Sequence, residues 1–406
     1  MLRRFNVIQE VPADEVPADE DIYDTMMVCK RKRGIDNCVT RFKMRCVLCG
    51  NQMNASTKRV DMRTNSPTIR SASFKMCCAA AAIDGARQRA YDVTAAYLQG
   101  TFQGERVYAR APKGCRKYDE RGVELVWLLF APLYGQPDAG RIWYNTYAHY
   151  VMEEDTCRFQ RCHYDPCVFV HTCDDSSGGG YITNVLYVDD GRTFDTNASQ
   201  CDGFIKRLAT RFAIKMDGLE YYLGMEISVP SPHVVILTSR TYIEALASRC
   251  LPKPADQYAA VHVPGDPSLL DYYEVALATR DVPRPRELVT RYLTLVGGLL
   301  WPAPNTRIDV LLEAGVLARA FTFPTEDLYK CAIRVLVYLW QHKSYGVRFT
   351  GLIDNADKIV AWVDSNWSTS RSITGGAIQM AGGNIWGISK RQDCAAGSSA
   401  HAELIA

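Results

Sequence analysis

The chain lacks long apolar runs and a regular cysteine pattern, and each absence argues against a class of protein. No stretch approaches the roughly 18 apolar residues of a membrane-spanning helix, so we expect no membrane partner. Arg3 and Arg4 are not followed by the apolar run of a secretory signal. The 15 cysteines are scattered, which disfavours a small disulfide-bonded scaffold and favours a reducing compartment.

The sequence also has little net charge and no complete zinc motif. Its net charge is only +2 over 406 residues, so a nucleic-acid site would have to come from local clusters of basic residues. Cys46 and Cys49 form a CxxC without a matching CxxC or HxxxH, and we interpret them as strand residues. A chain of this length with 47% hydrophobic residues predicts two or three folded domains.

Charge is distributed unevenly in the first 50 residues. Residues 1–26 contain a tandem VPADE repeat and seven acidic residues against two basic ones, which predicts a disordered acidic arm. From Lys30 to Arg45, seven basic residues flank a Gly-Ile-Asp-Asn turn that holds the only acidic residue of this stretch, which predicts a positively charged β-hairpin. A nucleic-acid or triphosphate clamp, a solvated strand face and a nuclear-import signal all fit this pattern.

Apolar periodicity predicts the later elements. We expect a helix over 71–86, a strand ending near residue 93, and a helix over 141–155 whose aromatic residues face the core. An apolar strand from residue 181 ends in two aspartates at a hairpin tip, and the proline-rich residues 281–290 read as a linker. Packed helices follow, and short strands with glycine turns from about residue 358 indicate a separate α/β module.

Three carboxylates carry the chemistry that the residues themselves suggest. Asp189 and Asp190 are adjacent at the end of an apolar strand, where like charge and partial burial are costly. A bound divalent cation relieves this cost, and hard oxygen ligands suit Mg²⁺. With Asp92 as a third ligand, the group could hold two metals for in-line phosphoryl transfer. The plainer interpretation is an aspartate-rich surface turn.

The order of several motifs resembles the reverse transcriptase of copia-type LTR retrotransposons from Val28 to Ala406. FKMRCVLCGNQ resembles the family's YKARLVARG, DVTAAYLQG resembles DVKTAFLNG, and LYGQPDAGRIWY resembles LYGLKQAPRAWY. LYVDD matches the active-site signature, and LEYYLGMEI is similar to the primer-grip segment LKYFLGIEI. VDSNW, RSITGG, IWGISKRQ and SSAHAE resemble pieces of a ribonuclease H domain.

The resemblance implies a multi-domain α+β fold and an activity. After the acidic arm at 1–26, it implies fingers and palm of a right-hand polymerase at 27–228, a helical thumb or connection at 229–350, and a truncated ribonuclease H-like module at 355–406. The implied activity is RNA-directed DNA polymerase, a nucleotidyltransferase that uses two Mg²⁺ ions, with Mn²⁺ as a substitute, and deoxynucleoside triphosphates. Its partners would be an RNA template, a DNA primer and an RNA–DNA hybrid, in cytoplasmic particles and the nucleus.

The resemblance also assigns roles to individual positions. Asp92, Asp189 and Asp190 would be the catalytic metal ligands, and Tyr97 would be a steric gate against ribonucleotides, although a core aromatic fits its spacing equally well. The other assigned positions would contact the nucleotide (Lys43, Arg45, Val93, Tyr134 and Gly135) or the primer (Tyr187, Val188, Gly224, Met225 and Glu226). Asp364 and Glu403 would be the first two catalytic metal ligands of the ribonuclease H site.

Departures from the family pattern leave alternatives open. The chain ends three residues after Glu403, so we expect little or no ribonuclease H activity. GRTFD replaces the usual apolar residues after YVDD, which predicts a weakened second strand, and Ala139-Gly140 replaces the family's Ala-Pro. A degenerate element that folds and binds nucleic acid without polymerising is therefore the rival hypothesis, and a structural Ca²⁺ or Mg²⁺ loop protein is a weaker third.

Overall fold

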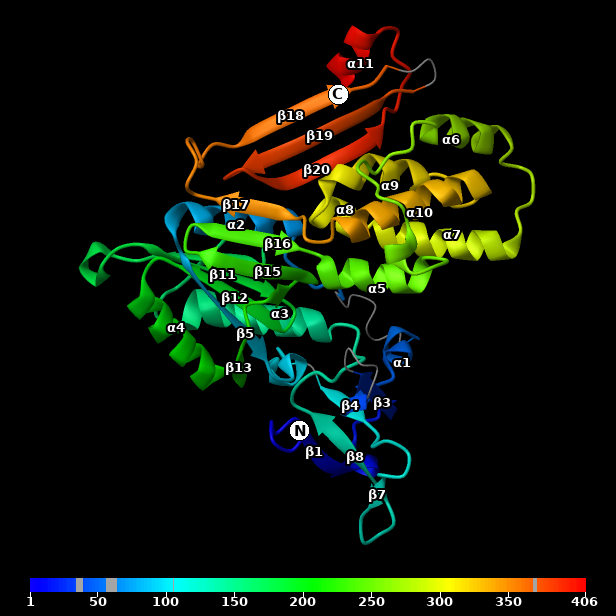
Figure 1. Cartoon of the computed structure of the whole chain (residues 1–406). Coiled ribbons are helices and arrows are strands. Elements are labelled where there is room, and N and C mark those ends of the chain that lie inside the picture. The colour runs from blue at the N-terminus through cyan, green and yellow to red at the C-terminus, as the bar shows by residue number, and fades with distance from the viewer. Residues whose placement is uncertain (34–38, 56–63, 105, 368–370) are drawn as a thin grey trace. The chain divides into compact units, whose positions relative to one another are not determined.

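The computed structural model describes residues 1–33, 39–55, 64–104, 106–367 and 371–406, and the predicted Gly-Ile-Asp-Asn turn at 34–37 lies outside them. The fold is mixed α/β and divides into two compact units (Figure 1). The first comprises residues 1–69, 90–193 and 197–217, and the second comprises 70–89, 194–196 and 218–406. Among the described residues, every helix is too short or too polar to cross a membrane.

The first unit begins with two small sheets. The five-stranded sheet has the order β1-β8-β6-β2, with β7 also paired to β8, and comprises β1 (Ile8–Pro12), β2 (Ile22–Tyr23), β6 (Val107–Ala109), β7 (Lys117–Tyr118) and β8 (Glu124–Leu129). The antiparallel pair β3 (Thr25–Arg33) and β4 (Val39–Leu48) confirms the expected basic hairpin, and α1 (Gly50–Ala55) follows it.

The expectation of a disordered N-terminal arm is wrong for its strand-forming residues. Ile8 to Pro12 pair antiparallel with Leu129 to Leu125 of β8, and Ile22–Tyr23 pair with β6. Val7 is completely buried, so apolar residues on both sides of the acidic positions anchor the arm. The VPADE repeat itself supplies only the end of β1 and a short 3-10 turn at Ala13–Glu15.

A six-stranded sheet holds the predicted aspartates. Its order is β13-β5-β12-β11-β10-β9, and it comprises β5 (Arg87–Val93), β9 (Gln160–Arg161), β10 (Val168–Thr172), β11 (Tyr181–Tyr187), β12 (Asp190–Asp195) and β13 (Ile214–Asp217). Helices α3 (Ala139–His149), extended by a π-helical turn at Tyr150–Glu154, and α4 (Ala198–Arg211) belong to the same unit. As expected, the aromatic face of α3 is core: Trp143, Tyr144 and Tyr147 are buried.

Strand β12 forms in full, which corrects the expectation that GRTFD would weaken it. Residues 191–195 are all buried, including the charged Arg192 and Asp195 at 0% exposure. Asp195 accepts from the Arg87 guanidinium at 2.8 Å, so its buried charge is compensated. Strand β12 therefore tolerates the buried Asp195 because Arg87 pairs with it, and residue propensity cannot predict such a partner.

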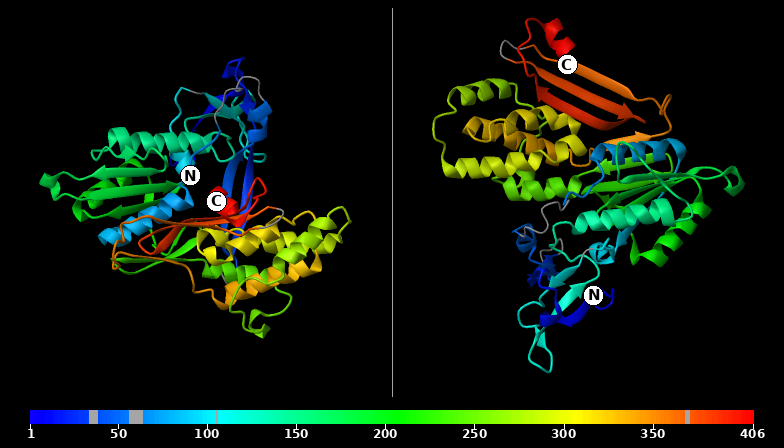
Figure 2. Two further views of the ribbon diagram at one scale, coloured as in Figure 1. Left: turned by 90° about the horizontal axis from the view of Figure 1, so that it is seen from above. Right: turned by 180° about the vertical axis from the view of Figure 1, so that it is seen from behind.

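The second unit combines a helical layer with two sheets. Its helices are α2 (Ser71–Asp84), α5 (Arg240–Cys250), α6 (Leu269–Ala278), α7 (Arg286–Leu299), α8 (Pro302–Asn305), α9 (Leu311–Ala318), α10 (Glu326–Gln341) and α11 (Ser399–Ile405). The four-stranded sheet runs β14 (Tyr221–Tyr222), β15 (Met225–Ser231), β16 (Val234–Thr238), β17 (Val347–Thr350), and the three-stranded sheet runs β18 (Val360–Ser365), β19 (Ile373–Met380), β20 (Gly383–Arg391). Figures 1 and 2 show the helical layer on one face of β18–β20 and α11 on the other.

Local sequence explains several of these helices. The alanine-rich α2 ends at Gly85, whose φ of +62° is the left-handed conformation that terminates helices. Thr325 is the N-cap of α10, and its hydroxyl accepts from the Leu328 amide. The apolar face of α10 packs in the core of the helical layer with α5, α6, α7 and α9, so this part is one core. The expected linker at 281–290 is shorter than predicted, because α7 already begins at Arg286.

Candidate active site

The hairpin turn between β11 and β12 presents two of the three aspartates. Val188 and Asp189 form a two-residue turn, and Asp190 opens β12. Val188 has a φ of +58°, a strained conformation for a β-branched residue. The indole of the buried Trp143 donates to the Val188 carbonyl at 2.6 Å. This hydrogen bond from α3 fixes the turn, and with it the direction in which the aspartates point.

Asp92 lies beside this turn because a backbone hydrogen bond connects the two segments. The amide of Val93, at the end of β5, donates to the carbonyl of Asp189 at 2.8 Å. On the other side of β5, Asp92 lies opposite Lys215 of β13. The structure therefore brings Asp92 close to the adjacent pair Asp189 and Asp190, which lies far from it in the sequence.

A buried polar network supports the strands behind the aspartates. The hydroxyl groups of Tyr91 and Tyr147 lie 2.6 Å apart, and Tyr91 also donates to the side-chain oxygen of Asn184 at 2.7 Å. All three residues are at most 1% exposed. A Cβ on Gly191 would collide with the ring of Tyr91, so the glycine that follows the aspartates is needed for packing. No sequence motif indicates this network, since single tyrosines and an asparagine form no recognisable pattern.

The electrostatics of the aspartates show repulsion between like charges. Burial raises the pKa of Asp190 to about 6, and the charges of Asp189, Asp92 and Asp217 add to this effect. Burial and the charge of Asp189 likewise raise the pKa of Asp92, while Lys43 and Lys215 oppose the rise. Asp217 is a fourth carboxylate that the sequence analysis did not find. A divalent cation would neutralise a negative potential of this kind.

The donor chemistry fits Mg²⁺, although the carboxylates do not form a closed cage. Within the described ranges, no three acidic, imidazole or thiol side chains are arranged as a ready-made metal-binding group. Mg²⁺ commonly takes only one or two carboxylates and completes its shell with water and substrate phosphates. Three mutually repelling carboxylates are therefore compatible with an ion whose remaining ligands come from substrate.

Aromatic and basic residues adjoin the aspartates within the first unit. The rings of Tyr97 and Tyr134 lie 5.2 Å apart, and the Arg45 guanidinium lies 5.2 Å from the Tyr134 ring centre. Burial raises the pKa values of both tyrosines, and the charge of Asp189 raises them further. Gly135 has a φ of +85° and packs against the backbone of Leu48. Together these contacts connect the basic hairpin to the turn after β8.

The remaining predicted positions have different surroundings. Val93 is completely buried, and Tyr187 is 37% exposed at the end of β11. In the second unit, Gly224 lies in the tight turn between β14 and β15, and Met225 is buried. Glu226 accepts from Thr238 and from the Thr241 amide at the start of α5. Burial favours a higher pKa for Glu226, but these hydrogen bonds lower it overall.

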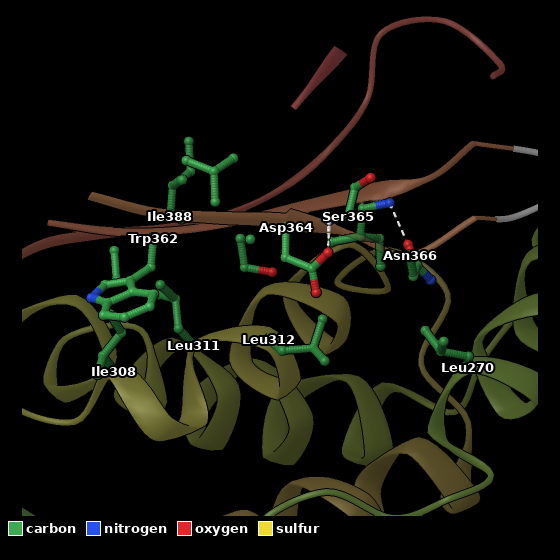
Figure 3. Close-up of a pocket in the computed structure, with 15 residues that line it drawn as sticks. Leu270, Ile308, Leu311, Leu312, Trp362, Asp364, Ser365, Asn366 and Ile388 are labelled. Atoms are coloured by element: carbon green, nitrogen blue, oxygen red, sulfur yellow. Dashed lines mark hydrogen bonds between the residues drawn. The ribbon is translucent and has the colours of Figure 1, made fainter. Parts of the chain in front are cut away.

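Asp364 and Glu403 lie on different elements of the second unit. Asp364 of β18 accepts from the Ser365 amide at 2.8 Å and lines a cavity of about 520 Å³. Figure 3 shows its carboxylate directed toward Leu312 of α9, across an otherwise largely apolar lining. Glu403 is exposed on α11.

Comparison with known proteins identifies the class to which this fold and site belong. Residues 12–249 match the family model described as reverse transcriptase (RNA-dependent DNA polymerase). This match covers more than half of the chain, so the chain belongs to the reverse transcriptase family.

The relatives specify the branch of the family. The Pol polyprotein of transposon RE1 from Arabidopsis thaliana is 26% identical over 392 residues, covering 95% of this chain and 25% of the relative. The Pol polyprotein of transposon TNT 1-94 from Nicotiana tabacum is 25% identical over 403 residues, which cover 97% of this chain and 29% of the relative. Among solved structures, a foamy viral protease-reverse transcriptase in complex with double-stranded DNA has a TM-score of 0.48 at 10% sequence identity. The match covers 100% of this chain and 56% of the foamy viral chain. The chain is a copia-type retrotransposon reverse transcriptase region, and it spans about a quarter of the length of these polyproteins.

The raised pKa of Asp190 predicts a pH-dependent gain in stability when its charge is removed. Between about pH 4 and pH 6 the folded chain binds the Asp190 proton and the unfolded chain does not, so this group lowers stability as pH rises through that window. Without divalent ions, we expect Asp190→Asn to raise the melting temperature at pH 7.5 by roughly 2–4 °C, about 1 kcal/mol after solvent screening. Below pH 4 the unchanged chain and Asp190→Asn should have the same melting temperature.

Thermal unfolding followed by circular dichroism at pH 3.8 and 7.5 measures this effect. Glu120→Gln is the matched control, because Glu120 is an exposed carboxylate in the turn between β7 and β8. A destabilised Asp190→Asn chain at pH 7.5 would contradict the assignment of a repulsive cluster.

Proposed function

We propose that this chain is the RNA-directed DNA polymerase part of a retrotransposon Pol protein, which adds deoxynucleotides to a DNA primer on an RNA template. The observation that carries the proposal is the junction between β5 and the β11–β12 turn. The Val93–Asp189 hydrogen bond brings Asp92 beside Asp189 and Asp190, and burial together with the charges of Asp189 and Asp92 raises the pKa of Asp190 to about 6. Perturbed carboxylates of this kind are typical of catalytic sites.

The proposed mechanism assigns a role to each group of residues. Asp92, Asp189 and Asp190 would hold Mg²⁺, which when bound activates the primer hydroxyl and stabilises the pyrophosphate leaving group. Lys43 and Arg45 of β4 would orient the triphosphate, since a guanidinium pairs with phosphate oxygens in a bidentate manner. Tyr134 positions Arg45 through its ring, at 5.2 Å. Tyr187 and Val188 would contact the primer end, together with Gly224, Met225 and Glu226.

The domain assignment is part of the same proposal. Residues 27–228 would be the fingers and palm, 229–350 the thumb or connection, and 355–406 a ribonuclease H-like module. The basic β3–β4 hairpin would contact phosphates of the template and primer without sequence preference, so binding should weaken steeply with salt.

A second candidate is an inactive remnant that binds nucleic acid without polymerising. The observation that favours it is that no three potential metal ligands in the described parts of the chain are arranged as a metal-binding group. Primer extension separates the two candidates.

The decisive experiment is primer extension on an RNA template with Mg²⁺. We expect the chain to incorporate deoxynucleotides and Asp189→Asn to reduce the rate by roughly 100-fold or more, because a catalytic metal ligand contributes several kcal/mol. Glu120→Gln should retain the full rate. Equal incorporation by the chain and Asp189→Asn would reject the catalytic assignment, and no incorporation by the chain itself would support the remnant.

The position of Tyr97 predicts sugar discrimination. Its half-buried ring lies beside Tyr134 near the aspartates, where it would exclude a ribose 2′-hydroxyl. We expect Tyr97→Ala to increase ribonucleotide incorporation relative to deoxynucleotide incorporation by about 10- to 100-fold, measured as a ratio of kcat/KM values. Tyr97→Phe keeps the ring and should retain discrimination. An unchanged ratio in Tyr97→Ala would indicate that the ring serves only packing.

We expect little or no ribonuclease H activity from this chain. Asp364 faces the cavity against α9, whereas Glu403 is exposed on α11. A labelled RNA–DNA hybrid incubated with Mg²⁺ should therefore be cleaved no faster by the chain than by Asp364→Asn. Cleavage that depends on Asp364 would overturn this expectation.

A further inference from the structure

Three arginines gather in the second unit where helices α6 and α9 approach the end of β20. Arg319 caps the C-terminus of α9, Arg391 is the last residue of β20, and Arg371 precedes β19. Together with Tyr273 of α6, they line two cavities of about 420 and 190 Å³. Residues from four separate segments therefore share one concave surface.

These arginines have no carboxylate partner among the residues that the structure describes. Arg319 and Arg391 are only partly exposed, and buried cations are normally paired. Three carboxylates also line the cavities, but Asp393 contacts Lys390 at 3.3 Å, and Asp271 and Glu274 are exposed on α6. None of the three forms an ion pair with an arginine of the group in the described part of the chain, so the guanidinium groups are left without a direct carboxylate contact.

The electrostatic effect of this arrangement falls on Arg319. Burial lowers its pKa below the usual value, and the charge of Arg391 lowers it further, while Tyr273 opposes the change. Arg391 therefore lies close enough to Arg319 for its positive charge to act on that guanidinium. Repulsion between unpaired cations at a concave surface is relieved by binding an anion.

Tyr273 adds a neutral donor to the same surface. Its side chain is only 6% exposed, and its ring packs beside Phe323. Its hydroxyl makes no hydrogen bond to any residue in the described ranges, and the tyrosine lines both cavities. A nearly buried tyrosine usually has a hydrogen-bond partner for its hydroxyl, so an acceptor in the cavity would complete it.

We propose that Arg319, Arg371, Arg391 and the Tyr273 hydroxyl form an oxyanion site that takes a phosphate group. Guanidinium forks match the geometry of phosphate oxygens, and the hydroxyl supplies a further donor. The larger cavity has room for the groups attached to a phosphodiester as well as for free phosphate. This site is separate from the aspartates, and the proposal does not rest on nucleotidyl transfer.

Isothermal titration of the full chain with inorganic phosphate, at constant ionic strength against chloride, tests the site. We expect Arg391→Gln and Arg319→Gln each to weaken phosphate binding about 10-fold, whereas Arg249→Gln on α5 leaves it unchanged. Because Arg319→Gln also removes a buried like charge, it should raise the melting temperature in chloride. Wild-type affinity for phosphate in both cavity variants would overturn the proposal. If Arg319→Gln does not fold, the phosphate affinity of Arg391→Gln tests the site by itself.

A second measurement distinguishes the source of the phosphate. The affinity of the chain for an RNA–DNA hybrid oligonucleotide is measured as a function of salt concentration. If the site takes a nucleic-acid phosphate, Arg391→Gln should reduce the slope of log K against log salt by about 1. An unchanged slope together with weakened phosphate binding would support a free phosphate ligand. An unchanged slope with unchanged phosphate binding would exclude the site.

Discussion

The repulsion among Asp92, Asp189 and Asp190 is the constraint on which the proposed site depends. Burial raises the pKa of Asp190 to about 6, and the charges of Asp189 and Asp92 contribute to the rise. The fold maintains this arrangement through backbone and core contacts, chiefly the Val93–Asp189 and Trp143–Val188 hydrogen bonds. A rigid support that opposes local repulsion is what a preorganised cation site requires.

The surrounding structure compensates for its other buried polar groups. Asp195 at the far end of β12 pairs with Arg87, and Arg307 in the helical layer pairs with Asp309 at 2.7 Å and donates to the His342 carbonyl at 2.9 Å. The aspartates and the arginines around Tyr273 are different, because each group brings charges of one sign close together. Both therefore point to ligands of opposite charge, a cation at the first and a phosphate at the second.

Most elements of secondary structure followed from local pattern. The alanine-rich segment is helix α2, the basic runs are the β3–β4 hairpin, and the aromatic stripe is the buried face of α3. The predictions of secondary structure that were wrong concern polar segments. Residues 8–12 form a strand because β8 pairs with them, and GRTFD forms β12 between β5 and β11, where Arg87 pairs with the buried Asp195. Both strands depend on partners that are distant in the sequence, and residue propensity cannot predict such partners.

The sequence by itself determined the identity of the three aspartates, the order of the motifs and the positive charge of the hairpin. Only the tertiary structure decided that Asp217 joins the aspartates, that Gly191 is required by the ring of Tyr91, and that Arg319, Arg371 and Arg391 share cavities with Tyr273. The physical reason is the difference between separation along the sequence and distance in space. Propensity and periodicity act over a few neighbouring residues, whereas electrostatic repulsion and steric contact depend on distances in space that the fold alone sets.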